Sequence, residues 1–358
     1  METRAGAETT GAPAAAGVRT DWWAVPSRVR SRVEESLGSP VEHAATQAGG
    51  FSPGVAARVR LADGRRVFVK AVGPEPKPDT PGLHRAEAGI TAALPVTAPV
   101  PSLLMALELD GWVVLVLEDV DGRTPAQPWR PDELRRVLAA TTELSALLDP
   151  SPVEAPTLAD RFGGRFRGWR LLAAAAAEGA DDLARLDPWA RRHLGRLVGR
   201  EAGWSAAASG SALVHGDLRA DNVLLTDDRV MVVDWPWASV GAPWFDVVAM
   251  GPSVIMQGAP DAMGSLDRHL HARGADAEDV TTVLIALAGC FLRQSVQPPP
   301  PGLPTLRGFQ RAQGEAALDW VRERTGWRQP WGRGSSSPGP ARRPPGARTD
   351  RGARPGPG

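Results

Sequence analysis

The chain has 358 residues, of which 42% are hydrophobic and 23% are charged, so it can bury a large core and its length indicates two domains or lobes. Its 41 basic and 41 acidic residues cancel, which excludes a whole-molecule field that would attract a nucleic acid or an anionic membrane. The lone cysteine, Cys290, excludes an internal disulfide framework and a cysteine-ligated metal site.

Neither the start of the chain nor any internal segment carries a membrane signal. The N-terminus has no apolar h-region, and the longest uncharged apolar segment, 280–292, has 13 residues, too few to span a bilayer. Residues 1–20 and 329–358 lack hydrophobic periodicity and are predicted to be disordered. We expect a cytoplasmic protein without a membrane partner or a specific nucleic-acid partner, occurring as a monomer or weak dimer.

One helix and a small antiparallel sheet are predicted for the first third of the chain. Pro26 begins a helix with Val29, Val33 and Leu37 on one stripe, and Gly38 ends it. Alternating apolar residues and tight turns then predict a sheet of about five strands. Its clearest strands are 55–61, 66–70, 103–109 and 112–117.

A glycine-bearing turn, 49–54 with the sequence Gly-Gly-Phe-Ser-Pro-Gly, joins the first strands of this sheet. At Gly50 and Gly54 the backbone N-H groups can approach phosphate oxygens without side-chain obstruction. However, glycine-rich turns are common, and this one is not the Gly-x-Gly-x-x-Gly of protein kinases. A phosphate-covering loop and a plain hairpin therefore both stay open.

Lysine is scarce in this sequence, since only Lys70 and Lys77 are lysines among the 41 basic residues. Lys77 lies in a proline-rich loop, whereas Lys70 ends the strand 66–70. A compact ammonium does not replace a guanidinium fork in a tight site. Lys70 is therefore the candidate for a functional lysine. On composition alone, a lysine that stands at a strand end by chance is an equal alternative.

Beyond the sheet the pattern becomes helical. A short helix, 83–94, carries Glu87 before the last hairpin, and the polar stretch 118–122 follows that hairpin. We expect an N-terminal lobe at 21–118 and a C-terminal lobe at 119–328. Apolar residues at helical spacing predict helices in the second lobe at 131–148, 169–177, 188–204, 276–297 and 305–324.

The most specific stretch of the sequence is His-Gly-Asp-Leu-Arg-Ala-Asp-Asn at 215–222. Two short apolar runs follow it, flank a turn and predict a β-hairpin. Asp217 and Asn222 lie in the loop that enters this hairpin, and Asp234 follows its second strand. The three oxygen-bearing side chains are therefore expected in one place.

This stretch resembles the aminoglycoside phosphotransferase family of kinase-like enzymes, whose motif has His-Gly-Asp where protein kinases have His-Arg-Asp. Asp217 and Asn222 have the spacing of a kinase catalytic loop, and Asp234 stands where the second metal ligand follows. The resemblance covers roughly residues 40–327. It implies an α+β, two-lobed protein-kinase-like fold, with a small antiparallel-sheet N-terminal lobe carrying one helix and a mainly helical C-terminal lobe.

The resemblance also implies an ATP-dependent phosphotransferase that acts on a hydroxyl of a small molecule, such as an antibiotic, a sugar or another metabolite. GTP is an alternative phosphate donor. Asp217 would be the catalytic base that accepts the hydroxyl proton. Asn222 and Asp234 would bind Mg²⁺, which prefers hard oxygen ligands.

For the nucleotide, the kinase resemblance implies four binding residues in the first lobe. Lys70, fixed by Glu87, would contact the α and β phosphates. Gly50 and Gly54 would lie over the phosphates in the glycine-bearing turn. The stretch 118–122 resembles the hinge between kinase lobes, whose backbone binds adenine.

Two residues near the motif have both a structural and a functional interpretation. His215 could act as a base, but beside Leu213 and Val214 a packing role is favoured. Asp246 matches an acid that braces the catalytic loop in kinase-like folds, and it could also cap a helix.

The acceptor side is less determined by the sequence. Residues 251–328 contain eight acidic residues and eight arginines, and this charge balance argues against a polycationic acceptor. Trp237, Trp244, Trp320 and Trp327 offer flat apolar surface for a sugar ring or a hydrophobic metabolite.

The competing hypothesis is a catalytically silent nucleotide-binding regulator with the same fold. The intact Asp217 argues against it. A protein kinase is disfavoured because Trp-Pro follows Asp234 in place of Phe-Gly.

Overall fold

The computed structural model describes residue 17 and residues 19–47, 49–51, 54–75, 80–180 and 182–327. The predicted disordered tail lies outside these residues, and so do Lys77 and most of the predicted leader. Arg19 and Thr20, at the end of that leader, are described and pair with Gly54. All elements below belong to the unit Met1–Gly326, which is distinct from Trp327–Gly358.

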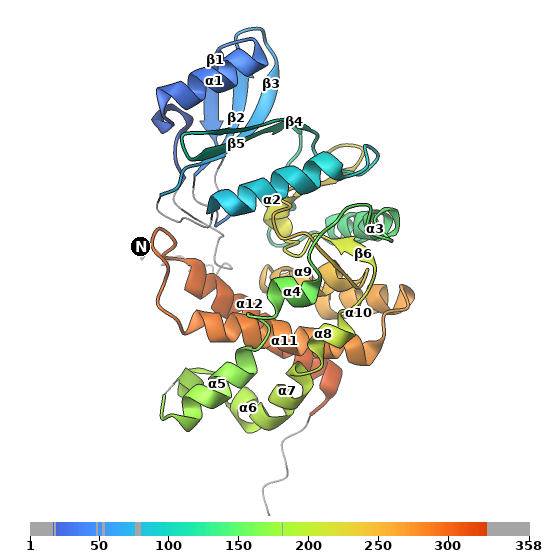
Figure 1. Cartoon of the computed structure of the whole chain (residues 1–358). Helices are drawn as coiled ribbons and strands as arrows, with labels where there is room; N and C mark the ends of the chain where they lie inside the picture. Colours follow the sequence, from blue (N-terminus) through green and yellow to red (C-terminus); the bar gives the residue numbers. More distant parts are fainter. Residues whose placement is uncertain are drawn as a thin grey trace, which may run out of the picture. The chain divides into compact units, whose positions relative to one another are not determined.

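A five-stranded antiparallel sheet forms the first part of this unit, with the strand order β1-β2-β3-β5-β4 (Figure 1). The strands are β1 (Val41–Thr46), β2 (Val55–Leu61), β3 (Arg66–Val72), β4 (Leu103–Leu109) and β5 (Trp112–Glu118). The predicted hairpins are therefore present. β3 continues past its predicted end, so Lys70 lies inside the strand.

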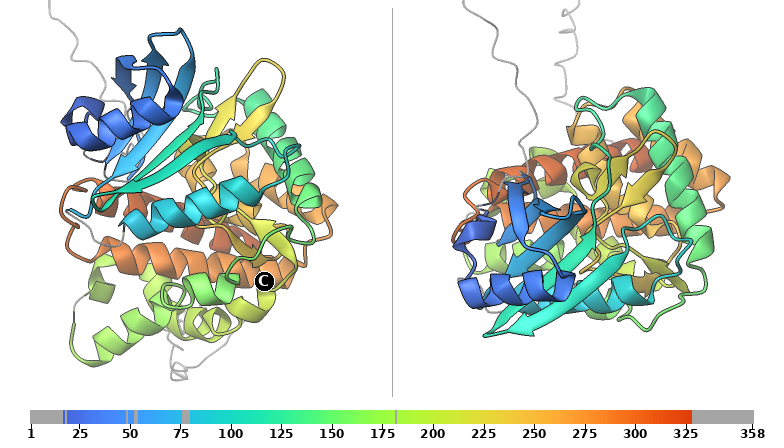
Figure 2. Two further views of the ribbon diagram at one scale, coloured as in Figure 1. Left: turned by 45° about the horizontal axis from the view of Figure 1, so that its top comes forward. Right: turned by 90° about the horizontal axis from the view of Figure 1, so that it is seen from above.

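Strand alternation gives this sheet two faces, and each is covered by one helix. The predicted stripe of α1 (Ser27–Leu37) packs on one face, and α2 (Thr80–Ala93) packs on the other (Figure 2). Val69 and Ala71 of β3 belong to the core on the α1 face. Lys70 lies between them in sequence and must therefore point to the α2 face.

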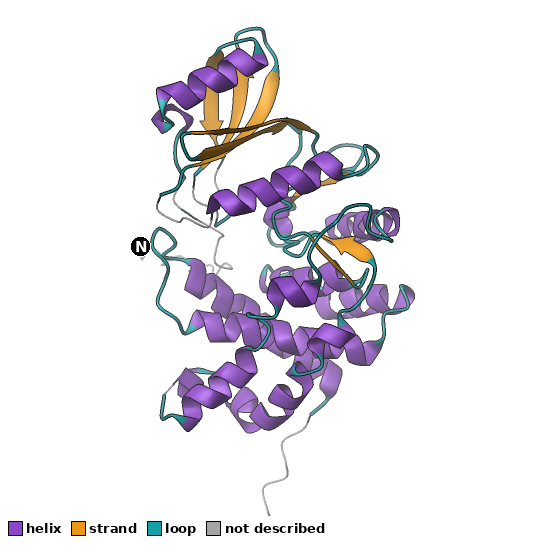
Figure 3. Cartoon of the chain, in the orientation of Figure 1, coloured by secondary structure: helices purple, strands orange, loops and turns teal. Residues whose placement is uncertain are grey.

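The rest of the unit is mainly helical, as Figure 3 shows. The helices α11 and α12 lie side by side and are both predicted by the sequence, whereas α4, α9 and α10 are not. The elements are α3 (Pro131–Leu147), α4 (Leu158–Phe162), α5 (Gly168–Ala177), α6 (Pro188–Arg192), α7 (Leu194–Glu201), α8 (Trp204–Ala207), α9 (Phe245–Met256), α10 (Ala262–Ala272), α11 (Ala277–Ser295) and α12 (Leu306–Thr325).

The prediction of one helix over 188–204 is wrong, because this segment forms α6 and α7 and ends at the first residue of α8. The breaks fall at His193 and near Gly203, where the backbone leaves regular α-helical geometry. The His193 ring also lies 2.9 Å from the carbonyl oxygen of Trp189, one turn earlier. Three glycines in the segment lower its helix propensity, so apolar spacing alone overestimated its continuity.

Two short strand pairs stand within the helical part. The predicted hairpin is present as β7 (Val223–Leu225) and β8 (Val230–Val232). The pair of β6 (Ala212–Val214) and β9 (Ser239–Gly241) was not predicted. The chain is thus α+β, with a small antiparallel sheet and a mainly helical second part, as expected. Among the described residues, no helix is both long and apolar enough to cross a bilayer.

The contact between α5 and α11 gives a test of the packing. A Cβ added at Gly168 would lie 2.0 Å from the carbonyl oxygen of Gly289. We expect Gly168→Ala to lower the free energy of unfolding by about 1–3 kcal/mol, because backbone must move. The control is Gly199→Ala, where a Cβ meets no atom within 4 Å, and it should stabilise the protein by about 1 kcal/mol. Urea unfolding followed by tryptophan fluorescence measures both variants, and equal midpoints would contradict this packing.

Candidate active site

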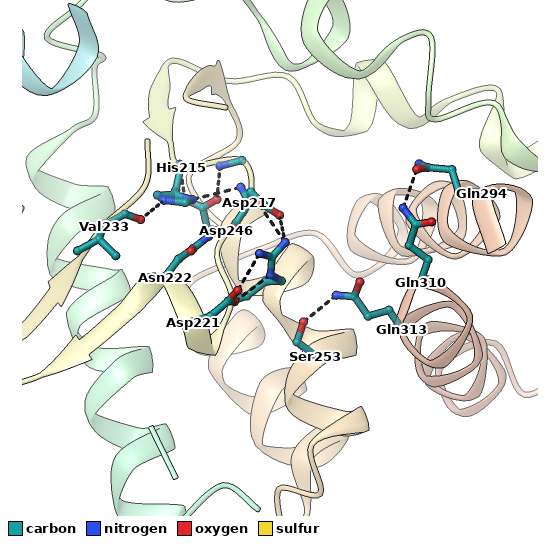
Figure 4. Close-up of polar contacts among 12 residues, drawn as sticks. His215, Asp217, Asp221, Asn222, Val233, Asp246, Ser253, Gln294, Gln310 and Gln313 are labelled. Carbon is teal, nitrogen blue, oxygen red and sulfur yellow. Dashed lines mark hydrogen bonds and ion pairs between the residues drawn. The ribbon is translucent and has the colours of Figure 1, made fainter. Parts of the chain in front are cut away.

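The loop that carries the polar motif is held by a carboxylate from a neighbouring helix. Asp246, in the first turn of α9, accepts hydrogen bonds from the backbone N-H groups of His215 (2.7 Å) and Gly216 (2.9 Å) (Figure 4). Gly216 has a φ of +81°, and a Cβ there would lie 2.5 Å from the carbonyl oxygen of Trp237. Asp246 is thus placed to brace the loop. It is not the cap of α9, since the N-cap residue is Trp244.

His215 is buried and fully engaged by hydrogen bonds. Its Nε2 lies 2.9 Å from the carbonyl oxygen of Val233, and its Nδ1 accepts the backbone N-H of Asp217 at 3.2 Å. This pattern requires the neutral ring with the proton on Nε2. The ring also packs edge-on against Trp235, with ring centroids 4.9 Å apart. The geometry favours the packing interpretation of His215 over a role as base.

Asp217 shares one arginine with a second carboxylate. Nη1 of Arg219 donates to both carboxylate oxygens of Asp217, at 2.8 and 3.0 Å. The Nε and Nη2 groups of the same guanidinium donate to the two oxygens of Asp221, each at 3.0 Å. Sequence reasoning missed Arg219, although a basic residue two positions after the motif aspartate was the available signal.

The environment of Asp217 moves its titration towards neutral pH. Burial raises the pKa of Asp217 to about 6, although the charge of Arg219 favours the carboxylate. The Asp217 side chain is 32% exposed, so it stays within reach of a small molecule. A carboxylate with this pKa is ionised at neutral pH and still takes up a proton readily, as general base chemistry requires.

Asn222 and Asp234 each offer a side-chain oxygen near this loop that could bind a metal ion. The Nδ2 group of Asn222 donates to the backbone carbonyl of Asp217 at 2.8 Å, which leaves Oδ1 as an acceptor. Asp234 has a φ of +71°, a left-handed conformation that side-chain-bearing residues adopt rarely. Burial opposes its ionisation, but the Lys70 ammonium lowers the pKa of Asp234 to about 2. Asp234 is therefore a carboxylate at any physiological pH.

Lys70 connects the sheet, α2 and the motif region. Its Nζ lies 2.6 Å from Oε1 of Glu87 and also forms an ion pair with Asp234. The Lys70 side chain is 14% exposed and that of Glu87 is 4% exposed. Burial works against the ammonium, but the two carboxylates outweigh it and raise the pKa of Lys70. The contact with Asp234 was not predicted from the sequence.

One cavity brings most of the predicted site residues together. The predicted residues that line it are Gly50, Lys70, Glu87, Asn222 and Asp234. Part of the predicted hinge 118–122 also contributes, since 118–120 lines the same cavity. Asp217 and Gly54 are not in its lining. Gly54 instead packs against the carbonyl of Ala71, where a Cβ would lie 2.5 Å away.

Arg19 is a further lining residue that the sequence did not reveal. Its guanidinium donates to the carbonyl of Gly49 in the glycine-bearing turn, and its backbone pairs with Gly54. Asp234 and Asp221 both attract its charge. No sequence signal marked it, because it stands in a compositionally biased segment.

A family model described as the phosphotransferase enzyme family matches residues 48–288 of the chain. The chain belongs to the phosphotransferase enzyme family. The resemblance seen in the motif is thereby confirmed, and this phosphotransferase is an enzyme. A search among curated protein sequences found no match.

Three solved structures show the same kinase-like fold as this phosphotransferase. A thermostable mutant of aminoglycoside phosphotransferase APH(4)-Ia, in ternary complex with AMP-PNP and hygromycin B, has a TM-score of 0.53 and 16% identity, over 84% of this chain and 100% of that one. A choline/ethanolamine kinase family protein from Mesorhizobium loti has a TM-score of 0.50 and 17% identity, over 83% and 99%. A Haemophilus somnus 129PT protein described as a fructosamine-3-kinase has a TM-score of 0.50 and 16% identity, over 83% and 96%.

The tryptophans expected on the acceptor side differ in accessibility. Trp320 is fully buried, and its indole N-H donates to the carboxylate of Asp267 at 3.2 Å, so it is a core residue and not a ligand surface. Trp237 and Trp244 are half-buried. Trp327 belongs to the second unit of the chain. Trp237 borders the motif loop, since its carbonyl oxygen would lie 2.5 Å from a Cβ added at Gly216.

Proposed function

We propose that this phosphotransferase moves the γ-phosphate of ATP, or of GTP, to a hydroxyl group of a small molecule. The observation that carries the proposal is that Lys70, Asn222 and Asp234 line one cavity, with Asp217 joined to Asn222 beside it. Phosphoryl transfer asks a protein mainly to position reactants and neutralise charge. These residues supply an ammonium for phosphates, oxygen donors for a metal ion and a base for the hydroxyl.

The nucleotide would lie against the sheet, in the lobe proposed at 21–118. Lys70 would contact the α and β phosphates, with Glu87 holding the ammonium from α2. The turn containing Gly50 would cover the phosphates, and the backbone of the hinge 118–122 would bind the adenine base. The APH(4)-Ia structure was obtained with AMP-PNP, which supports a nucleotide in this kind of fold. The acceptor would bind to the lobe proposed at 119–328.

The donor chemistry at the cavity suits Mg²⁺. Asn222 offers an amide oxygen and Asp234 an ionised carboxylate. The described residues contain no group of three or more His, Cys, Asp or Glu side chains that could hold a metal ion by themselves. Mg²⁺ does not need such a group, because it retains waters and takes phosphate oxygens as ligands. When bound, Mg²⁺ would neutralise charge on the phosphate oxygens.

Asp217 would accept the proton of the acceptor hydroxyl. Its two oxygens each receive one hydrogen bond from Arg219, which leaves further lone pairs on both. Arg219 therefore orients the carboxylate without blocking it. Asp221, on the other side of the guanidinium, holds Arg219 in this position.

A phosphate-transfer screen tests the proposal. We expect Asp217→Ala to lower kcat by about 100-fold or more, because the hydroxyl loses its proton acceptor, with nucleotide affinity unchanged. Transfer from Mg-ATP is measured over a panel of hydroxyl metabolites and antibiotics, with Asp227→Ala in the exposed β7–β8 turn as the control. Equal transfer by Asp217→Ala and the parent enzyme would contradict the mechanism. Tight nucleotide binding without turnover by the parent enzyme would favour the silent regulator.

The raised pKa of Asp217 predicts a pH dependence. A base must be deprotonated, and kcat/KM reports the free enzyme, so kcat/KM should fall about tenfold per pH unit below about pH 6. Arg219→Gln removes a charge that favours the carboxylate, so this acid limb should move to higher pH. Arg229→Gln, on the exposed turn, should leave the limb in place. An unchanged limb in Arg219→Gln would show that Asp217 does not set it.

Because the chain has only two lysines, the same substitution at Lys70 and at Lys77 gives a test and its control. We expect Lys70→Arg to weaken Mg-ATP binding and lower turnover, each by about tenfold, because a guanidinium does not fit between Glu87 and Asp234. Lys77→Arg is the control and should change neither value. Calorimetric titration and the transfer assay measure both effects. If Lys70→Arg has the Mg-ATP affinity and turnover of the parent enzyme, the scarcity of lysine does not indicate a functional role for Lys70.

A further inference from the structure

Two arginines lie over one tryptophan beside the motif loop. The guanidinium carbons of Arg161 and Arg165 are 6.0 and 4.3 Å from the ring centroid of Trp237. Arg161 donates to the carbonyl of Ala238 at 3.4 Å, and its buried Nε has no partner among the described residues. Neither arginine forms an ion pair with a carboxylate in the part of the chain that the structure describes.

The pair differs from those arginines of the chain that are neutralised by a carboxylate. Arg219 and Arg170, for example, are each neutralised by a carboxylate within hydrogen-bonding distance. Burial and the charge of Arg165 both lower the pKa of Arg161, so the two guanidiniums repel each other. Two adjacent cations without a counter-charge provide a favourable position for an anion.

The pair lies close to the proposed base. Phe162 follows Arg161 in the chain, and a Cβ at Gly216 would lie 3.4 Å from the Phe162 ring and 2.5 Å from the Trp237 carbonyl oxygen. Gly216 directly precedes Asp217. Trp237 is half-buried and Arg165 is exposed, so both are accessible to a small molecule.

We propose that Arg161, Arg165 and Trp237 form a subsite for an anionic group, a carboxylate or a phosphate, on the hydroxyl acceptor. The inference rests on the proposed function, since it names the chemical class of acceptor for the same site. Guanidinium groups bind both kinds of oxyanion through paired N-H donors, and the indole ring supplies apolar surface for a carbon skeleton. A polycationic acceptor would be repelled by the pair. The acceptor is therefore a hydroxy acid or a phosphorylated hydroxyl compound.

Equilibrium binding of four probes to the full chain tests the subsite. The probes are glycerol phosphate, glycerate, neutral glycerol and the polycation hygromycin B, each titrated with excess Mg-ADP present to keep them out of the nucleotide cavity. We expect both anions to bind about tenfold or more tightly than glycerol, the gain of one charge-assisted hydrogen bond. Hygromycin B should bind no better than glycerol. The tighter of the two anions identifies the favoured group.

Three variants assign the effect to the pair. Arg165→Gln, an exposed change, and Arg161→Gln should each weaken anion binding about tenfold and leave glycerol binding unchanged. Arg167→Gln, an exposed neighbour outside the pair, should behave as the parent, and thermal melting checks that each variant is folded. Anions that bind no better than glycerol, or that bind folded Arg161→Gln and Arg165→Gln at parent affinity, would overturn the inference. Failure of the proposed function would give a different result: anions would still bind in a way that depends on the two arginines, but no phosphate would be transferred.

Discussion

The arrangement of the site depends on the Lys70 ammonium, which lies between two carboxylates from different parts of the fold. Glu87 reaches it from α2 and Asp234 from the segment after β8. Removing one partner of such a buried pair typically costs about 3–5 kcal/mol, because a charge is left unpaired. The contact requires the observed register of β3, since a slip of one residue would turn Lys70 to the α1 face.

A second set of hydrogen bonds fixes the motif loop itself. Asp246 holds the backbone of His215 and Gly216, and the His215 ring joins the loop to Val233, next to Asp234. The loop and the segment carrying Asp234 are therefore linked by hydrogen bonds. These links would position the proposed base and the proposed metal ligands before any reactant binds, which lowers the reorganisation that phosphate transfer requires.

The two sides of the motif loop differ in charge. On the cavity side, Lys70 and Arg19 are compensated by carboxylates, including Asp234. On the other side, Arg161 and Arg165 lie over the face of Trp237 and form no ion pair with a carboxylate among the described residues. A ring face neutralises a cation much less than a carboxylate does. This difference separates the nucleotide end of the proposed site from the acceptor end, where an oxyanion would complete the charge balance.

Local patterns in the sequence determined much of the fold and part of the site. The hairpins, α1, α3, α11 and α12 follow from strand alternation, helical spacing and turn residues, all of which act over a few positions. Asp217, Asn222 and Asp234 were predicted together because one loop and one hairpin connect them. The family resemblance rested on the same short stretch. It added Glu87 and gave a phosphate-binding role to Lys70, which the scarcity of lysine had already marked.

The tertiary structure decided the contacts between distant segments. It joined Lys70 to Asp234, paired β6 with β9, brought Arg19 to the cavity and placed Arg161 and Arg165 over Trp237. Periodicity indicates which face of an element is buried, but not which other element covers that face. That choice depends on packing the whole chain, so the arginine pair of the proposed acceptor side was visible only in the folded structure.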